Sequence, residues 1–76
     1  MINDVIYTSP DILSGTPVFR GTRVPIKNLF DYIESGETLE EFLEAFPSVK
    51  KEQAIKVLEI AERVLTSSKF LNENFA

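Results

Sequence analysis

The sequence predicts a mostly α-helical domain in which short N-terminal strands, forming a β-hairpin, precede three helices in a helix-turn-helix arrangement. Two observations support this fold class. Residues 15–25 contain two prolines and two glycines among β-branched and aromatic residues, which is typical of strands and tight turns. From residue 26 onward the apolar residues recur with a period of about 3.6, as in an amphipathic helix. We divide this single domain of 76 residues into a strand and hairpin region (1–25), a three-helix region (26–66) and a C-terminal tail (67–76).

The hairpin is predicted from two short runs, residues 17–19 and 24–26, that lie on either side of Gly21 and Thr22. Two β-type runs separated by a glycine-containing pair favour a tight hairpin. A two-residue turn places Arg20 and Arg23 opposite each other, where like charges disfavour strand pairing by roughly 0.2 to 1 kcal/mol. We therefore expect an anion close to these two arginines. A further short strand is expected at residues 5–7.

The first helix is expected to begin at Pro25, because proline is well tolerated at the first helical position. Its apolar face consists of four residues at helical spacing: Ile26, Leu29, Phe30 and Ile33. Gly36 is expected to end this helix in the left-handed conformation.

The second and third helices are predicted from capping and periodicity. Thr38 and Glu41 have the spacing of a capping box, and Pro47 follows the end of the second helix. The third helix is expected over about residues 51–66, although Lys50 is a poor cap. Its apolar residues sweep roughly 220°, whereas a one-sided core helix needs about 100°. One side of this helix should therefore face the core, and the other should meet the hairpin, the tail or a second subunit.

The composition restricts the function. The chain contains neither cysteine nor histidine, so the usual zinc sites, thiol nucleophiles and neutral-pH general bases are missing. We therefore expect no enzyme activity, no metal, no cofactor and no small-molecule substrate. A chain of this size buries only about 60% of its unfolded surface, which favours association with a copy of itself or with another chain. Neither a secretion signal nor a membrane-spanning stretch is evident, so we expect a cytoplasmic protein that does not insert into a membrane.

The net charge of −4 argues against assigning nucleic-acid binding from composition alone, yet the charges are segregated. Residues 28–49 contain six acids and no base, and basic segments lie on both sides. In a helix-turn-helix unit the start of the third helix faces the major groove, and the residues there that can contact DNA are Lys50, Lys51, Gln53 and Lys56. Alternatively, Glu52 with Lys56 and Glu59 with Arg63 form i,i+4 ion pairs that only solvate a helix face.

Two other groups of residues are candidates for binding a partner. Arg23 is expected either to hold a carboxylate of Asp31 or Glu34 or to engage a partner, and Arg20 is expected to be the freer charge that reaches outward. The tail contains three large apolar residues that either fold back onto the third helix or dock on another chain: Phe70, Leu71 and Phe75.

The order of these motifs resembles a bacterial family of short proteins, described as a domain of unknown function, that has a Gly-Thr-Arg-x-Pro signature. The resemblance covers about residues 5–65 without large gaps and rests on residues 10–15, 17–25, Gly36, Thr38, Glu40, Glu41, Phe46, Pro47 and 52–55. The signature positions in this chain are Gly21, Thr22, Arg23 and Pro25, whereas Arg20 lies where the family is looser. Lys50 departs from the family, whose members usually have Ser or Thr there as a helix cap.

This resemblance implies a strand region followed by a homeodomain-like helix-turn-helix, and the role of a VapB-type antitoxin. The implied partner is a PIN-like ribonuclease toxin. We therefore expect a homodimer that neutralises its cognate toxin and regulates its own operon by binding operator DNA. Two alternatives remain open at this point: a stand-alone transcriptional regulator and a structural or interaction subunit.

Overall fold

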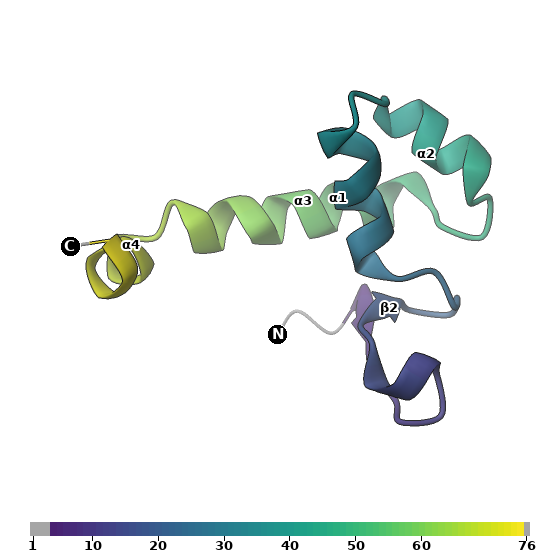
Figure 1. The fold of residues 1–76 in the computed structure, drawn as a ribbon, viewed down its shortest axis with the longest axis horizontal. Helices are drawn as coiled ribbons and strands as arrows, with labels where there is room; N and C mark the ends of the chain where they lie inside the picture. The colour runs from purple at the N-terminus through teal and green to yellow at the C-terminus, as the bar shows by residue number, and fades with distance from the viewer. Residues whose placement is uncertain (1–3, 76) are drawn as a thin grey trace.

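The computed structural model describes residues 4–75, with the side chains of Phe70, Asn74 and Phe75 outside the described part. Two short strands lie at the start of the chain and four helices follow (Figure 1). The elements, in order, are β1 (Ile6–Tyr7), the helical turn η1 (Leu13–Gly15), β2 (Val18–Phe19), α1 (Ile26–Glu34), α2 (Leu39–Ala45), α3 (Lys51–Leu65) and α4 (Ser68–Phe75). The predicted fold class, mostly helical with short strands first, is confirmed.

The strands form a small antiparallel sheet in which Ile6 pairs with Phe19 and Tyr7 pairs with Val18. The predicted pairing of residues 17–19 with 24–26 is also present, as an isolated bridge between Val18 and Pro25. Val18 is therefore paired on both sides, once with β1 and once with the chain that leads into α1. This double pairing fixes the point at which the first helix begins.

The first three helices begin and end close to where the sequence predicts. Pro25 is the N-cap of α1, one position before the first helical residue at which we expected it. Gly36 has a φ of +87° and ends the helix as predicted. The capping box of α2 is also confirmed, because the Thr38 amide donates to Glu41 Oε1 (2.6 Å) and the Glu41 amide donates to Thr38 Oγ1 (3.1 Å).

The core joins the strands to the helices through aromatic rings. Phe19 of β2 and Phe42 of α2 are fully buried, with ring centroids 5.9 Å apart. Phe42 also contacts Tyr32 of α1 (5.7 Å) and Phe46 (5.1 Å), and Tyr32 contacts Phe46 (5.7 Å). The other buried members of this core cluster are Val5, Leu29, Val49, Ala54 and Val57. Helix α3 thus contributes its two buried residues, Ala54 and Val57, from its first half, and its partly buried Leu58 and Ile60 pack against the same cluster.

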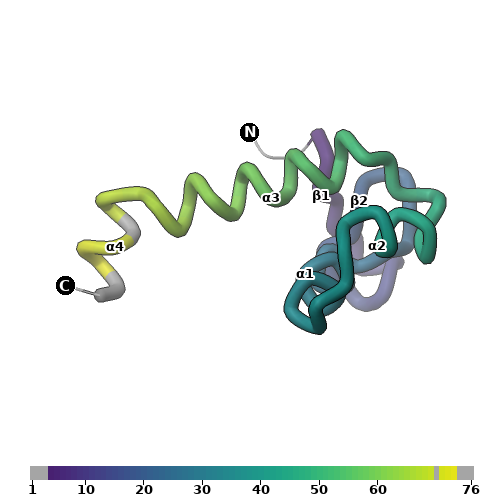
Figure 2. Tube along the Cα trace, turned by 90° about the horizontal axis from the view of Figure 1, so that it is seen from above, coloured from purple at the N-terminus to yellow at the C-terminus, as the bar shows by residue number. Residues whose placement is uncertain are grey.

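The second half of α3 extends beyond the rest of the fold, and α4 lies at its far end (Figures 1 and 2). The sequence did not predict α4, which occupies most of the region that we expected to be a tail. The apolar stripe of α3 continues into this extension, where Val64 is 47% exposed and Leu65 is 57% exposed. Within residues 4–75 no helix is both long enough and apolar enough to cross a bilayer.

The capping box gives the fold a predicted pH dependence. Hydrogen bonds from the backbone and the side chain of Thr38 lower the pKa of Glu41 below its usual value. A carboxylate whose pKa is lowered by folding stabilises the folded state above its unfolded pKa, and that contribution is lost as the pH falls through the folded pKa. We expect the stability advantage of the wild type over Glu41→Gln to be present at neutral pH and to shrink on acidification through the glutamate range. Urea unfolding at a series of pH values measures it, and a difference independent of pH contradicts the assignment.

Candidate partner-binding site

The signature residues form a closed loop, residues 20–23, between β2 and the start of α1; we call it the signature loop. The Thr22 amide donates to the Phe19 carbonyl (3.0 Å), and the Thr22 hydroxyl donates to the same carbonyl (2.8 Å). That hydroxyl also accepts from the Val24 amide (3.0 Å). Gly21 has a φ of +81°, as the third position of a type II turn requires. Thr22 closes the loop and Gly21 permits its turn, so both signature residues have a conformational role.

The loop is longer than the sequence predicts. The Phe19 amide donates to the Val24 carbonyl (3.0 Å), so four residues connect the paired positions and not two. Arg20 and Arg23 both lie within the connection and do not face each other across a ladder. The expected repulsion between paired arginines is therefore absent, because neither residue is part of the pairing between residues 17–19 and 24–26.

Arg20 is held against the N-terminal strand. Its guanidinium carbon lies 5.0 Å from the centroid of the Tyr7 ring, and its Nη2 donates to the Ile6 carbonyl (3.4 Å). The expectation that Arg20 is the freer charge is wrong for this reason. The pairing of β1 with β2 brings Tyr7 beside the loop, and the guanidinium stacks on the ring face as a cation–π contact.

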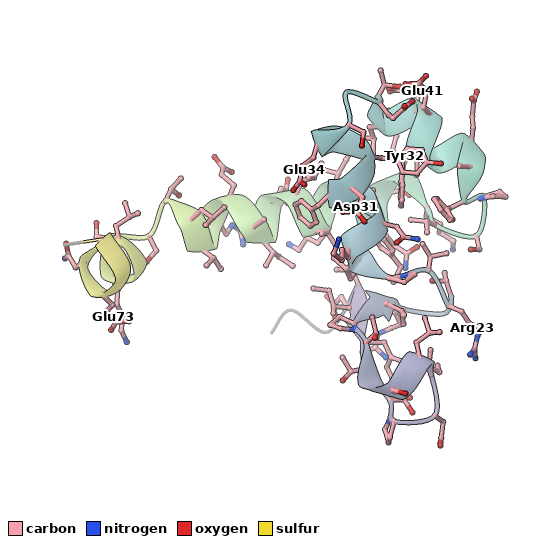
Figure 3. The ribbon with its side chains drawn as sticks, in the orientation of Figure 1. Arg23, Asp31, Tyr32, Glu34, Glu41 and Glu73 are labelled. Carbon is pink, nitrogen blue, oxygen red and sulfur yellow. The ribbon has the colours of Figure 1, made fainter. Side chains whose placement is uncertain are left out.

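Arg23 points away from the helices (Figure 3). It forms no ion pair with Asp31 or Glu34. The expected internal ion pair is wrong, because Asp31 is bound by Lys27 one helical turn earlier (2.8 Å). The hydrogen bond that the Lys27 ammonium donates to the Asp31 carboxylate raises the pKa of Lys27. Arg23 is exposed and makes no hydrogen bond or ion pair with another described residue. Its guanidinium is therefore available to a ligand.

An open pocket of about 560 Å³ lies beside the signature loop. Its volume falls within the range of small-ligand sites, roughly 300 to 1,000 Å³. The walls come from four separate segments of the chain: β1, the turn before η1, the signature loop and the turn before α3. The lining residues are Tyr7, Ile12, Arg20, Gly21, Thr22, Arg23 and Ser48. We call this the loop pocket.

The start of α3 is fixed to the signature loop by the side chain of Gln53. Its Nε2 donates to the Arg20 carbonyl (3.0 Å), and its Oε1 accepts from the Lys50 amide (2.9 Å). This second bond supplies part of the cap that Lys50 cannot provide. Both polar atoms of the Gln53 side chain are therefore already hydrogen-bonded within the fold. Contact of this side chain with a base edge of DNA requires both hydrogen bonds to break. Lys50 and Lys51 are exposed, and Lys56 is partly buried.

The other predicted side-chain pairs on α3 are not formed. Glu52 with Lys56, and Glu59 with Arg63, make no ion pair in the described structure. The alternative that these residues form i,i+4 ion pairs is therefore wrong.

Phe70, Leu71 and Phe75 of the expected tail, which were predicted to bind a partner, lie on α4. Leu71 is 41% exposed, so its side chain remains largely accessible to another chain. The side chains of Phe70 and Phe75 fall outside the described residues, so their predicted role is not tested. No group of three or more potential metal ligands is present in residues 4–75.

Three residues of the loop pocket were not predicted from the sequence: Tyr7, Ile12 and Ser48. The position of Tyr7 could have been predicted in part, because an aromatic residue at the end of a short strand favours pairing of that strand with another. Ile12 is followed by η1, in which Leu13 and Ser14 have φ values of 49° and 57°. Positive φ at non-glycine residues is uncommon and is not evident from the sequence. Ser48 reaches the site only through the tertiary placement of the turn before α3.

Replacing Thr22 tests whether it closes the signature loop. Thr22→Val keeps the shape of the side chain but removes the donor to the Phe19 carbonyl and the acceptor of the Val24 amide. We expect a loss of about 1 to 3 kcal/mol in the free energy of unfolding, measured with urea. Thr8→Val is the matched control, because Thr8 is exposed and its hydroxyl makes no hydrogen bond with a described residue. Equal effects of the two substitutions contradict the assignment.

Comparison with known proteins places this geometry in a family context. A solved structure, the crystal structure of a DUF433 member protein from Anabaena variabilis ATCC 29413, superposes with a TM-score of 0.69 at 23% identity. The superposition covers 96% of this chain and 70% of that one, and it supports the fold. The uncharacterized protein y4eO of Sinorhizobium fredii (strain NBRC 101917 / NGR234) is 46% identical over 50 residues. That match covers 66% of this chain and 23% of the relative, so this chain spans about a quarter of the relative's length.

The family model described as "Protein of unknown function (DUF433)" matches residues 6–61. The matched segment begins at β1, includes the signature loop and ends within α3. It therefore contains every residue that lines the loop pocket, and it stops before the exposed end of α3 and before α4. The chain belongs to the DUF433 family.

Proposed function

We propose that this protein is a non-enzymatic, cytoplasmic, antitoxin-like module that binds and neutralises a PIN-like ribonuclease toxin. The observation that carries the proposal is the loop pocket, an exposed and partly apolar site that displays the guanidinium of Arg23. Three of the residues that line the pocket, Gly21, Thr22 and Arg23, belong to the Gly-Thr-Arg-x-Pro signature, on which the resemblance to VapB-type antitoxins partly rests. Binding of a protein partner requires an accessible site of this kind and no catalytic group.

The proposal includes contact with operator DNA through the start of α3. Lys50 and Lys51 are exposed there, and α3 occupies the position of the second helix of a helix-turn-helix unit. The net charge of −4 weakens the attraction of the isolated chain to phosphate. We therefore expect the affinity for operator DNA to rise when the partner toxin is bound.

Self-association is the third part of the proposal. The apolar stripe of α3 continues past the core, where Val64 and Leu65 are exposed, and Leu71 of α4 is also exposed nearby in the chain. Pairing of two copies over this extension would bury apolar surface that the single chain leaves in water. Sedimentation equilibrium of the purified chain tests this part, and a monomer at every concentration measured contradicts it.

Co-purification with the ribonuclease encoded by the neighbouring gene tests the leading function. We expect a stable complex on size-exclusion chromatography and a loss of ribonuclease activity when this protein is added in equimolar amount. The ribonuclease with its catalytic acids replaced is the binding control, because it separates capture from any effect of cleaved RNA. Absence of a complex together with unchanged ribonuclease activity sinks the proposal.

The competing function, a stand-alone transcriptional regulator, makes a different prediction. In that case the isolated chain shifts DNA of its own promoter, and the affinity rises steeply as salt is lowered, because each phosphate contact releases counterions. Lys51→Glu should then weaken binding and reduce the salt dependence by about one contact, whereas Lys69→Glu on α4 should not. Tight, salt-dependent binding without any toxin favours the regulator, and equal effects of the two substitutions exclude α3 as the DNA surface.

A further inference from the structure

We propose that the loop pocket binds an acidic side chain of the partner protein together with a neighbouring large apolar side chain. This inference rests on the proposed function, because it names the kind of segment through which the toxin is recognised. The carboxylate is bound by backbone amides of the signature loop and by the Arg23 guanidinium. The apolar side chain lies against the wall formed by Tyr7 and Ile12, which also line the pocket.

The signature loop offers two backbone donors that the fold does not use. The amides of Arg20, Thr22 and Val24 donate to Val5, Phe19 and the Thr22 hydroxyl, respectively. The amides of Gly21 and Arg23 donate to no described residue. Both residues line the pocket. Backbone N–H groups in a turn are well suited to bind an anion, and a carboxylate has oxygens enough to accept from several donors.

The space above the loop is open to a ligand. A Cβ atom added at Gly21 would meet no other atom within 4 Å. The space beside this residue is therefore not filled by the rest of the protein. The guanidinium of Arg23 extends from the same loop and is directed away from the helices (Figure 3). A guanidinium binds a carboxylate through two parallel hydrogen bonds. The loop thus combines an exposed charged donor with two backbone donors.

The wall formed by Tyr7 and Ile12 favours an apolar group. Ile12 contributes an aliphatic side chain, and it precedes the η1 turn, whose backbone has positive φ at Leu13 and Ser14. Strain of this kind persists only where surrounding structure enforces it, so the position of Ile12 is well determined. Tyr7 presents ring carbon at the pocket, with one face covered by Arg20. An acidic residue beside a large apolar residue matches the two walls.

A protein segment fits this site better than nucleic acid does. The Tyr7 ring already has the Arg20 guanidinium over one face, which reduces its use as a platform for a nucleobase. The chain carries a net charge of −4, with six acids and no base in residues 28–49. That field opposes a polyanion far more than it opposes one carboxylate. The pocket therefore favours a ligand with a single local charge.

A titration with small probes tests the pocket without the partner. We expect phenylacetate, which combines a carboxylate with an apolar ring, to shift the NMR signals of the Gly21 and Arg23 amides of the 15N-labelled full chain in a saturable manner. Phenylacetamide has the same shape without the charge and should bind far more weakly. Arg23→Gln should raise the dissociation constant for phenylacetate by about tenfold. Arg63→Gln, in the exposed half of α3, is the matched control and should change it little.

Three results of this titration overturn the inference. They are unshifted Gly21 and Arg23 amides, equal binding of phenylacetamide, and equal weakening by the Arg63 substitution. Inorganic phosphate serves as the probe for a nucleic-acid ligand. If phosphate binds the loop more tightly than phenylacetate does, the site favours a phosphate and the inference is also overturned.

Capture of the toxin separates this inference from the proposed function. We expect Arg23→Glu to abolish capture of the neighbouring ribonuclease, whereas Arg63→Glu retains it. Circular dichroism and urea unfolding of both variants show that each is folded. If the wild type captures the ribonuclease and Arg23→Glu does so equally well, the loop pocket is not the binding site, although the antitoxin role stands. If the wild type captures nothing, the proposed function fails, and the inference that the pocket recognises the toxin fails with it.

Discussion

The packing of Phe19 against Phe42 determines where the rest of the structure can lie. Phe19 is the last residue of β2, and the signature loop begins at the next position. Because both rings are fully buried and Phe42 contacts two further aromatic rings, the end of β2 is fixed relative to α1 and α2. Truncating a buried phenylalanine commonly costs about 3 to 5 kcal/mol, which is a large part of the stability of a small domain. The loop is therefore mounted on the core directly.

Hydrogen bonds from two side chains, Thr22 and Gln53, then hold the backbone of the signature loop and of the start of α3. The Thr22 hydroxyl binds one carbonyl and one amide of the loop, and Gln53 binds the Arg20 carbonyl on one side and the Lys50 amide on the other. Each of these side chains satisfies backbone groups that would otherwise depend on water. As a result, the charged groups of Arg23, Lys50 and Lys51 can remain exposed while their backbones are held in place. Rigid backbones reduce the entropy that a partner must overcome on binding.

The features that the sequence predicted well depend on neighbouring residues. The capping box of α2, the positive φ of Gly36 and the place where α1 begins all follow from side chains within four positions of each other. The role of Arg20 was predicted wrongly because it depends on a residue far away in the sequence, and the ion pair of Arg23 was predicted wrongly because a nearer cation competes for Asp31. Tyr7 reaches Arg20 through the pairing of β1 with β2, and Lys27 binds Asp31 one turn away before Arg23 can do so.

Helix α4 and the loop pocket were missed for related reasons. Two serines after α3 indicate the end of a helix, and they do not show that another begins at Ser68. The pocket needs four segments to converge, and the conformation of η1 is not evident from its residue types. Periodicity and turn signals describe one segment at a time. They therefore predict elements better than they predict a site between elements.

The continuity of α3 has a consequence for how a partner can bind. This helix of 15 residues is about 22 Å long, and it connects the neighbourhood of the loop pocket to the exposed apolar residues at its far end. For a partner that binds at one end of α3, the distance to the second contact region is set by a helix and not by a flexible linker. The second contact is then intramolecular, with a high effective concentration when the partner's spacing matches and almost none when it does not. The length of α3 would thus select partners by their dimensions as well as by their chemistry.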